Sequence, residues 1–419
     1  MSKYLSPLLN NLKELNSKNE GYSISCFNKY YKIINFSPGP AQINKKILDE
    51  VKNEIFNNDS KYKYGVTPFE MSHRSPEFNN ILDNVNDKLR LFMKIPKDFV
   101  IIWTQGGGHG QFSSIPLNMK RIFKNVIGGY YVTGTWSSRA YEESKKFIKS
   151  HNLNEIYYKN YKNPIEYNIL PEKFIKNEID YLYLCSNETV NGTEFKKNGT
   201  NLPNRKQLGK TKLVVDMSSD FLMKEVDWSC IDVAFACTSK NMGLAGSNVL
   251  ILRKELLNNC DENEKIPCIL DWKLYYDSDS LYNTPSVFNL YLFEKILDCY
   301  FDEMKNITQM DNYNQAKAQY LYDYLDNSEL FKCSIVDLKS RSNINIPFVV
   351  GNGNPILRCQ FLDYCYKHNV VGLRTKTPFN YEDLNLLEPL RISLYNGIEL
   401  EDVKYLIKIM ENFEKIVLE

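Results

Sequence analysis

Lys240 occupies a position at which a lysine could form a covalent bond to a ligand. It follows an apolar run at 233–237 that is typical of a buried strand, and a glycine-punctuated turn leads to a second apolar run at 247–252. A buried ammonium group is costly unless it is paired or neutralised, and forming an imine is one chemical solution. Lysines with depressed pKa values are the usual Schiff-base nucleophiles. The alternative is a surface lysine in a hairpin turn, and position alone does not decide between the two.

A run of glycines, Gly106-Gly-Gly108, follows the predicted strand at 98–103 and precedes an apolar helical pattern. Glycines at a helix N-terminus let backbone N–H groups approach an anion, which the helix dipole also favours. The same residues also make an ordinary tight turn. Their spacing matches neither a P-loop nor a dinucleotide-binding fingerprint.

An acid, an aromatic ring and a hydroxyl follow three other predicted strands. Asp216 ends an apolar run at the expected carboxyl edge of the sheet, where a carboxylate can keep a pyridinium nitrogen protonated, or can cap the next turn. Trp136 either stacks on a planar ring or fills the core. Thr189 either donates to a phenolate oxygen or closes a turn.

Each of these sites is ambiguous alone, but together they form a set. Five consecutive strand ends offer a glycine-rich turn, an aromatic plane, a hydroxyl, an acid and a lysine, in that order. These are the groups needed to hold pyridoxal phosphate at the mouth of a parallel sheet.

The elements that must position these residues alternate along most of the chain. Strands are predicted at 98–103, 125–132, 181–185, 213–215, 233–237 and 249–252, and helices at 44–56 and 76–93. This alternation predicts an α/β fold, in which helices flank a mostly parallel sheet.

The C-terminal part has a different pattern. A long helical region runs from 286 to 304 and continues to 325; it is followed by a strand at 344–350 and helices at 356–368 and 401–415. We therefore expect an extension at 1–32, a large domain at 33–300 whose first residues pack with the small domain, and a smaller α+β domain at 301–419.

Composition excludes several classes of protein. The 419 residues carry 52 basic and 51 acidic side chains, so nothing favours nucleic acid or a membrane surface as a partner, and no apolar stretch is long enough to span a bilayer. None of the ten cysteines forms a C-x-x-C pair, and no two of the four histidines have metal-ligand spacing. We expect reduced thiols, no metal site and a cytoplasmic protein.

Two segments have no clear chemical role. Residues 1–32 lack the apolar core of a signal peptide, and their acids and lack of arginine disfavour a transit peptide, although organellar targeting stays open. Residues 196–212 contain six basic side chains and no acid, which favours a solvated surface insert over a binding patch.

Nine ordered motifs together resemble the phosphoserine aminotransferase family, a class-V, fold-type I group that depends on pyridoxal phosphate. They are Asn35-Phe-Ser-Pro-Gly-Pro-Ala41, Glu70-Met-Ser-His-Arg-Ser75, Gln105-Gly-Gly-Gly-His-Gly-Gln-Phe112, Ile115-Pro-Leu-Asn118, Asn187-Glu-Thr189, Asp216-Met-Ser-Ser-Asp220, Ser239-Lys-Asn241, Tyr282-Asn-Thr-Pro285 and Arg391-Ile-Ser-Leu-Tyr-Asn396. The resemblance covers nearly the whole chain from residue 35 onward.

The resemblance implies a role for each residue toward the cofactor. Lys240 would form the Schiff base and move a proton between the substrate Cα and the cofactor, and Asp216 would pair with the ring nitrogen. The remaining cofactor-binding residues would be Gly108, His109, Trp136, Thr189 and Ser239, together with Asn283 and Thr284 from the partner subunit of a homodimer with shared sites.

The resemblance also implies a substrate-binding set. Arg391 would grip the substrate α-carboxylate through a bidentate contact, for which lysine is a poor substitute. His73 and Arg74, contributed across the dimer, would bind the substrate phosphate or the distal carboxylate of glutamate.

The sequence departs from the family pattern in two places. Ser239 replaces the glutamine that usually precedes the Schiff-base lysine. The segment 372–391 is longer than usual and lacks the His-Arg pair that helps bind the phosphate of phosphoserine; Arg374 and Lys376 are the available replacements.

The reaction implied is transamination between 3-phosphohydroxypyruvate and glutamate, giving 3-phosphoserine and 2-oxoglutarate in serine biosynthesis. The altered segment leaves a second possibility, an aminotransferase for a non-phosphorylated amino or keto acid. A third is a non-catalytic dimer of the same fold, which the joint presence of Lys240, Asp216, Trp136, Thr189 and Arg391 disfavours.

Overall fold

A computed structural model describes most of the chain. The described residues are 33–56, 66–154, 179–196, 202–258, 260–261, 263–335, 337–373 and 389–419. The predicted extension at 1–32, part of the basic segment and most of the altered segment, including Arg374 and Lys376, lie outside them.

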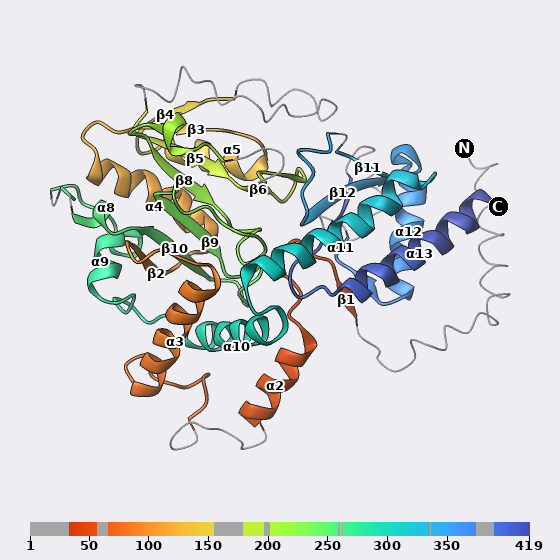
Figure 1. Ribbon diagram of the computed structural model, residues 1–419, viewed down its shortest axis with the longest axis horizontal. Helices are drawn as coiled ribbons and strands as arrows, with labels where there is room; N and C mark the ends of the chain where they lie inside the picture. Colours follow the sequence, from red (N-terminus) through yellow and green to blue (C-terminus); the bar gives the residue numbers. More distant parts are fainter. Residues whose placement is uncertain are drawn as a thin grey trace.

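A seven-stranded sheet forms the centre of the larger part of the molecule (Figure 1). In spatial order its strands are β2 (Phe99–Gln105), β10 (Ser247–Arg253), β9 (Val233–Cys237), β8 (Lys212–Asp216), β5 (Tyr181–Cys185), β3 (Ile127–Tyr130) and β4 (Lys149–Asn152). Strand β10 is antiparallel to both neighbours, and the other pairs are parallel. This arrangement confirms the predicted α/β fold with a mostly parallel sheet.

Both faces of the sheet are covered by helices because alternate side chains of each strand point to opposite faces. In β5, Tyr181 and Tyr183 join the core that also contains residues of helices α4 (Gly107–Ile122) and α9 (Trp272–Asp277). Leu182 and Leu184 join the core on the other face. That second core includes residues of helices α2 (Lys45–Phe56), α3 (Pro76–Phe92) and α10 (Val287–Met304).

The helix starts follow local sequence signals. Ser75 caps α3 by accepting a hydrogen bond from the backbone of Phe78, and Pro76 occupies the first turn, where its missing N–H costs nothing. The helix predicted at 76–93 is therefore observed, one residue shorter. The helical region expected from 286 to 325 is confirmed, but it is divided into two helices. Lys305 has a φ of 60°, and Asn306 caps a new helix, α11 (Ile307–Asn327).

A third hydrophobic core lies in the C-terminal part, at the right of Figure 1. Its elements are the antiparallel sheet β11 (Phe331–Cys333), β12 (Asn345–Val350) and β14 (Leu390–Ser393), with α11, α12 (Pro355–Lys367) and α13 (Leu400–Leu418). Ile34 and Phe36 also belong to this core, because β1 (Ile34–Asn35) pairs in parallel with β13 (Val370–Val371). The domain limits at 300 and 301 stay a prediction, since α11 contributes both to this core and to the core that contains α2, α3 and α10.

The remaining short elements connect these parts. They are α5 (Thr135–Ser144), the hairpin of β6 (Asn187–Glu188) and β7 (Thr193–Glu194), α7 (Arg205–Leu208), α8 (Glu255–Asn258) and the 3₁₀ turns Cys268–Leu270 and Gly351–Gly353. The interpretation of 196–212 as a solvated surface insert is only partly correct for its described part, in which Lys206 and Lys210 are exposed but other residues pack into the fold. Leu208 is fully buried, Arg205 pairs with Asp232 at 2.8 Å, and Lys212 begins β8.

Candidate active site

A cavity of about 360 Å³ lies at the carboxyl ends of the parallel strands. The predicted residues that line it are Gly108, His109, Trp136, Thr189, Asp216, Ser239, Lys240 and Arg391. They come from five strand ends of the large sheet and from β14 of the small one. The structure therefore brings together all the predicted site residues that were not expected from a partner subunit.

Lys240 lies in the turn between β9 and β10, but its side chain is not on an open surface. Its Nζ donates to the carbonyl oxygen of Pro38 at 2.7 Å and to the hydroxyl of Tyr395 at 3.3 Å. A Cβ at Gly39 would come within 3.0 Å of the Lys240 Cε, so the glycine allows the chain to pass closely over the lysine. The turn therefore presents a held amine at the cavity wall.

The pKa of Lys240 results from opposing effects. Burial lowers this pKa, but the neighbouring Tyr395 hydroxyl and Cys237 thiol raise it more, so that it stands above its ordinary value. The depressed pKa expected of a Schiff-base lysine is therefore not a property of the cofactor-free site.

Asp216 ends β8 and is almost fully buried. Its Oδ1 accepts from the backbone N–H of Ser218 at 2.9 Å, and its Oδ2 accepts from the hydroxyl of Tyr183 at 3.1 Å. Burial raises the pKa of Asp216 to about 6. Asp216 thus both caps the turn and lines the cavity, so the two interpretations offered for it are compatible.

The glycine-rich turn begins helix α4. Gly106 has a φ of 90°, a left-handed conformation that favours glycine, and no side-chain cap is found at this helix start in the described chain. The first N–H groups of a helix have no partner within it, and residues 106–109 line the cavity. The turn thus offers backbone donors and the positive end of a helix dipole to an anion.

Trp136 sits in the first turn of α5, where its ring lies edge-on to His109 with 5.7 Å between centroids. Glu188 fixes this helix start. Its Oε2 accepts from the backbone of Trp136 at 2.9 Å, and its Oε1 accepts from the backbone of Ser137 at 2.8 Å. A Cβ at Gly134 would lie 2.3 Å from the Glu188 Cδ, so only glycine permits this approach.

Glu188 lies within the motif Asn187-Glu-Thr189, but the sequence pattern did not predict a role for it. The available signal was an acid placed between Asn187 and Thr189, directly after a buried strand. Burial raises the pKa of Glu188 to about 7, and the donors from α5 offset part of that cost.

Arg391 brings a positive charge to the cavity from the small sheet. It is buried, and its NH1 donates to the backbone carbonyl of Thr189 at 2.8 Å. The residue proposed to hold a substrate carboxylate is therefore fixed against the residue proposed to reach the cofactor.

Four predicted site residues do not line the cavity: His73, Arg74, Asn283 and Thr284. Asn283 accepts from the hydroxyl of Tyr275 at 2.9 Å, and the carbonyl oxygen of Thr284 accepts from Gln105 at 2.7 Å. All four are predicted to act across a dimer interface, and this stays a prediction for a single chain.

The described residues contain no group of three or more His, Cys, Asp or Glu side chains that could hold a metal ion. None of their helices is long and apolar enough to cross a membrane. The nine cysteines among them are free thiols; Cys185 and Cys299 are buried, and Cys237 lines the cavity.

Comparison with known proteins agrees with this geometry. A family model for class-V aminotransferases matches residues 33–406. The probable phosphoserine aminotransferase of Caenorhabditis elegans is 33% identical over 389 residues, which cover 91% of this chain and 97% of that protein.

Solved structures show the same relationship. The phosphoserine aminotransferase from Bacillus circulans subsp. alkalophilus matches with a TM-score of 0.80 and 27% identity over 92% of this chain and 99% of its own. The phosphoserine aminotransferase with bound pyridoxal phosphate from Trichomonas vaginalis gives 0.78 and 28%, over 91% and 100%. This chain therefore belongs to the class-V aminotransferases and, within them, to the phosphoserine aminotransferase family.

Proposed function

We propose that this protein transfers an amino group between glutamate and 3-phosphohydroxypyruvate, producing 2-oxoglutarate and 3-phosphoserine for serine biosynthesis. The observation that carries the proposal is the convergence of Lys240, Asp216 and the start of helix α4 on one cavity, in a chain of this family.

The residues of the cavity fit pyridoxal phosphate, the cofactor of the family. A volume of about 360 Å³ is within the range of small-ligand sites. The uncapped start of α4, with Gly108 and His109, would hold the phosphate group; Ser239 lies on the same wall. Asp216 would hold the proton of the ring nitrogen, and Trp136 and Thr189 would fix the ring plane and its oxygen. When bound, the cofactor supplies an electron sink that makes the substrate Cα–H acidic.

Residues of the chain transfer the proton and bind the substrate carboxylate. Lys240 accepts the Cα proton and returns it, acting as general base and then as general acid. Arg391 holds the substrate carboxylate with its planar pair of donors. Because Arg391 is already bonded to Thr189, substrate binding requires little reorganisation of this arginine.

The assembly that we propose is a homodimer with shared sites. This proposal is supported by the position of Asn283 and Thr284 outside the cavity of their own chain, together with their place in a family motif. His73 and Arg74 would complete the partner's substrate pocket in the same way. The proposed compartment is the cytoplasm; the alternative, organellar targeting by residues 1–32, would be detected by the location of a C-terminally tagged full-length chain.

The reaction is tested by spectral titration of the purified holoenzyme with phosphoserine, glutamate and alanine. We expect phosphoserine and glutamate, but not alanine, to change the cofactor absorbance. If neither phosphoserine nor glutamate changes the cofactor absorbance, the protein is the non-catalytic dimer.

The substrate is tested by comparing kcat/KM for phosphoserine and serine. A site that pairs a charged phosphate should discriminate against serine by at least about 100-fold. The altered segment at 372–391 permits the second candidate, a non-phosphorylated substrate, and equal values for the two amino acids would establish it.

A further inference from the structure

Tyr395 contacts Lys240 and is not part of the cavity lining. It follows β14 and is almost completely buried, with 1% of its surface exposed. Its hydroxyl lies 2.8 Å from the carbonyl oxygen of Pro38 and 3.3 Å from the Nζ of Lys240. The buried hydroxyl of Tyr395 therefore contacts the amine of Lys240 without lining the cavity.

The directions of these hydrogen bonds follow from the chemistry of the groups. A carbonyl oxygen can only accept, so the single hydroxyl proton of Tyr395 is donated to Pro38. Toward Lys240 the hydroxyl is then an acceptor, and the amine must donate. The Pro38 oxygen also accepts a bond from Lys240 at 2.7 Å, so the three groups form a closed triangle.

This triangle fixes the orientation of the amine. Two N–H bonds of Lys240 are directed to Pro38 and Tyr395, whether the amine is charged or neutral. The remaining position, which is the lone pair of the neutral amine, points away from both. A lone pair with a fixed direction is what a nucleophile and a general base require.

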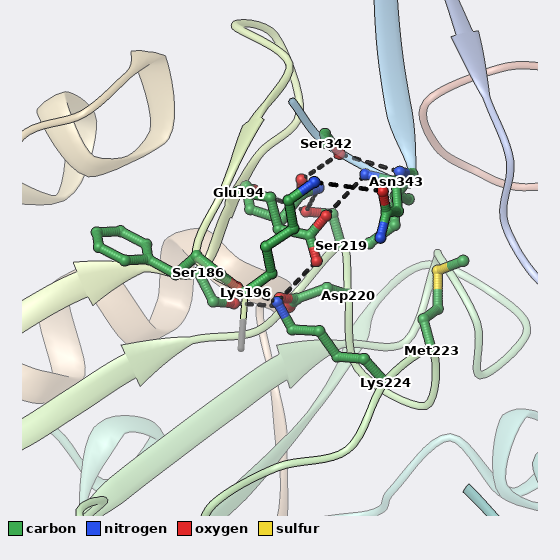
Figure 2. A network of polar contacts seen from close by, with 12 residues as sticks. Ser186, Glu194, Lys196, Ser219, Asp220, Met223, Lys224, Ser342 and Asn343 are labelled. Atoms are coloured by element: carbon green, nitrogen blue, oxygen red, sulfur yellow. Dashed lines mark hydrogen bonds and ion pairs between the residues drawn. The ribbon is translucent and has the colours of Figure 1, made fainter. Parts of the chain in front are cut away.

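Tyr395 is itself held by neighbours from several elements. The side-chain amide of Asn345 donates to its hydroxyl at 3.4 Å, and Asn345 in turn accepts from Asn187 at 2.7 Å. The buried Nζ of Lys317 donates to the carbonyl of Tyr395 at 3.3 Å. Asn187 also accepts from Ser342, which belongs to the polar network of Figure 2. These contacts hold the Tyr395 hydroxyl in place before any ligand binds.

We propose that Tyr395 is a positioning residue for Lys240, which aims the ε-amino group at the cofactor and at the substrate Cα. This inference rests on the proposed function and assigns to the small sheet a direct part in the chemistry of the lysine. Tyr395 acts through Lys240 and contacts neither cofactor nor substrate.

The test is Tyr395→Phe, which removes the hydroxyl and keeps the ring. The full chain is freed of cofactor, pyridoxal phosphate is added, and the rate of covalent attachment is followed by absorbance. Borohydride reduction and peptide mass spectrometry then locate the attachment on Lys240. The rates are compared at a pH high enough that the amine is neutral in both proteins, because loss of the hydroxyl also removes an effect that raises the pKa of Lys240. There we expect attachment to be slower by about fivefold to tenfold, the effect of losing one hydrogen bond.

A second readout separates positioning from simple loss of structure. With glutamate deuterated at Cα, the variant should show a larger primary isotope effect on kcat than the wild type, because proton transfer to a misdirected amine becomes slower. The KM for glutamate should stay within about twofold, since Arg391 is untouched.

The matched control is Tyr322→Phe. Tyr322 is also buried, and its hydroxyl donates to a backbone carbonyl, that of Ser342, at 2.7 Å without contacting Lys240. This control should lose stability but keep the wild-type attachment rate and isotope effect. If both variants behave alike, Tyr395 has only a structural role and the inference is wrong.

The proposal remains testable if Tyr395→Phe does not fold. A chain with 3-fluorotyrosine at position 395 keeps the hydroxyl but makes it a weaker acceptor, so attachment should be slower by a smaller factor. An unchanged rate would overturn the inference. A wild-type protein that fails to attach pyridoxal phosphate at all would instead overturn the proposed function.

Discussion

Two half-buried lysines in this molecule have opposite kinds of partner. Lys224, in the network of Figure 2, lies 2.8 Å from a carboxylate oxygen of Glu194 and 2.8 Å from one of Asp220. Lys240 donates only to neutral oxygens among the described residues, those of Pro38 and Tyr395. The charge of Lys224 is therefore neutralised by two carboxylates, whereas Lys240 is held only by hydrogen bonds to neutral groups.

The difference shows how a fold separates a structural lysine from a reactive one. Both carboxylates raise the pKa of Lys224 against the opposing effect of burial, so its charge is permanent. Glu194 also accepts from the backbone of Asn343 at 2.7 Å, which ties the β6–β7 hairpin to the small sheet. Lys240 has no such counter-charge to remove before it can react.

The largest expected effect is that of Lys240→Ala on catalysis. The variant lacks both the nucleophile and the general base, so transamination should fall by at least about 10³-fold. Its free energy of unfolding should fall by only about 1–2 kcal/mol, because two hydrogen bonds to neutral groups are lost and no buried charge is left unpaired. Stopped-flow half-reactions and urea unfolding measure the two quantities.

The opposite pattern is expected of Lys224→Met. Leaving the carboxylates of Glu194 and Asp220 buried without their cation should lower the free energy of unfolding by about 3–5 kcal/mol. The kcat of the folded fraction should remain close to wild type. Adding Glu194→Gln should restore part of the stability, and no recovery in the double variant would contradict the ion-pair explanation.

A pH-dependent effect on stability is expected at Asp216, a carboxyl that is buried without a cation among the described residues. Because burial raises its pKa to about 6, the cofactor-free folded protein binds more protons than the unfolded chain between the ordinary pKa and this value. Asp216 therefore costs stability as pH rises through that window. The free energy of unfolding of Asp216→Asn, relative to wild type, should increase by about 2 kcal/mol from pH 4 to pH 7.

Urea unfolding of the two cofactor-free proteins at several pH values measures this difference. A relative stability that does not change with pH would show that Asp216 is not shifted. The same substitution should abolish transamination, because Asn carries no negative charge to hold a proton on the ring nitrogen.

Much of the fold was predictable because its signals are local. The strand at 181–185 is a continuous apolar run, and helix α3 has both a capping serine and a first-turn proline. The site residues at strand ends were predictable for the same reason, since the carboxyl ends of parallel strands meet at one edge.

The remaining features depend on contacts between distant parts of the chain. Nothing near Tyr395 in the sequence indicates that it bonds to Lys240, because that contact requires the small sheet to dock on the large one. The cap that Glu188 provides to α5 likewise joins residues that are 51 and 52 positions apart. The break at Lys305 was missed because the helical pattern continues across a residue with positive φ.

The triangle of Pro38, Lys240 and Tyr395 draws on three regions that leave the ribosome at very different times. Synthesis proceeds from the N-terminus, so Pro38 and Lys240 emerge well before Tyr395. A nascent chain that has just exposed Lys240 therefore still lacks the residue that aims it. Capture of the vitamin-derived aldehyde would reach its full rate only after residue 395 has been synthesised and the small sheet has docked, so loading of the enzyme would follow assembly of its two sheets.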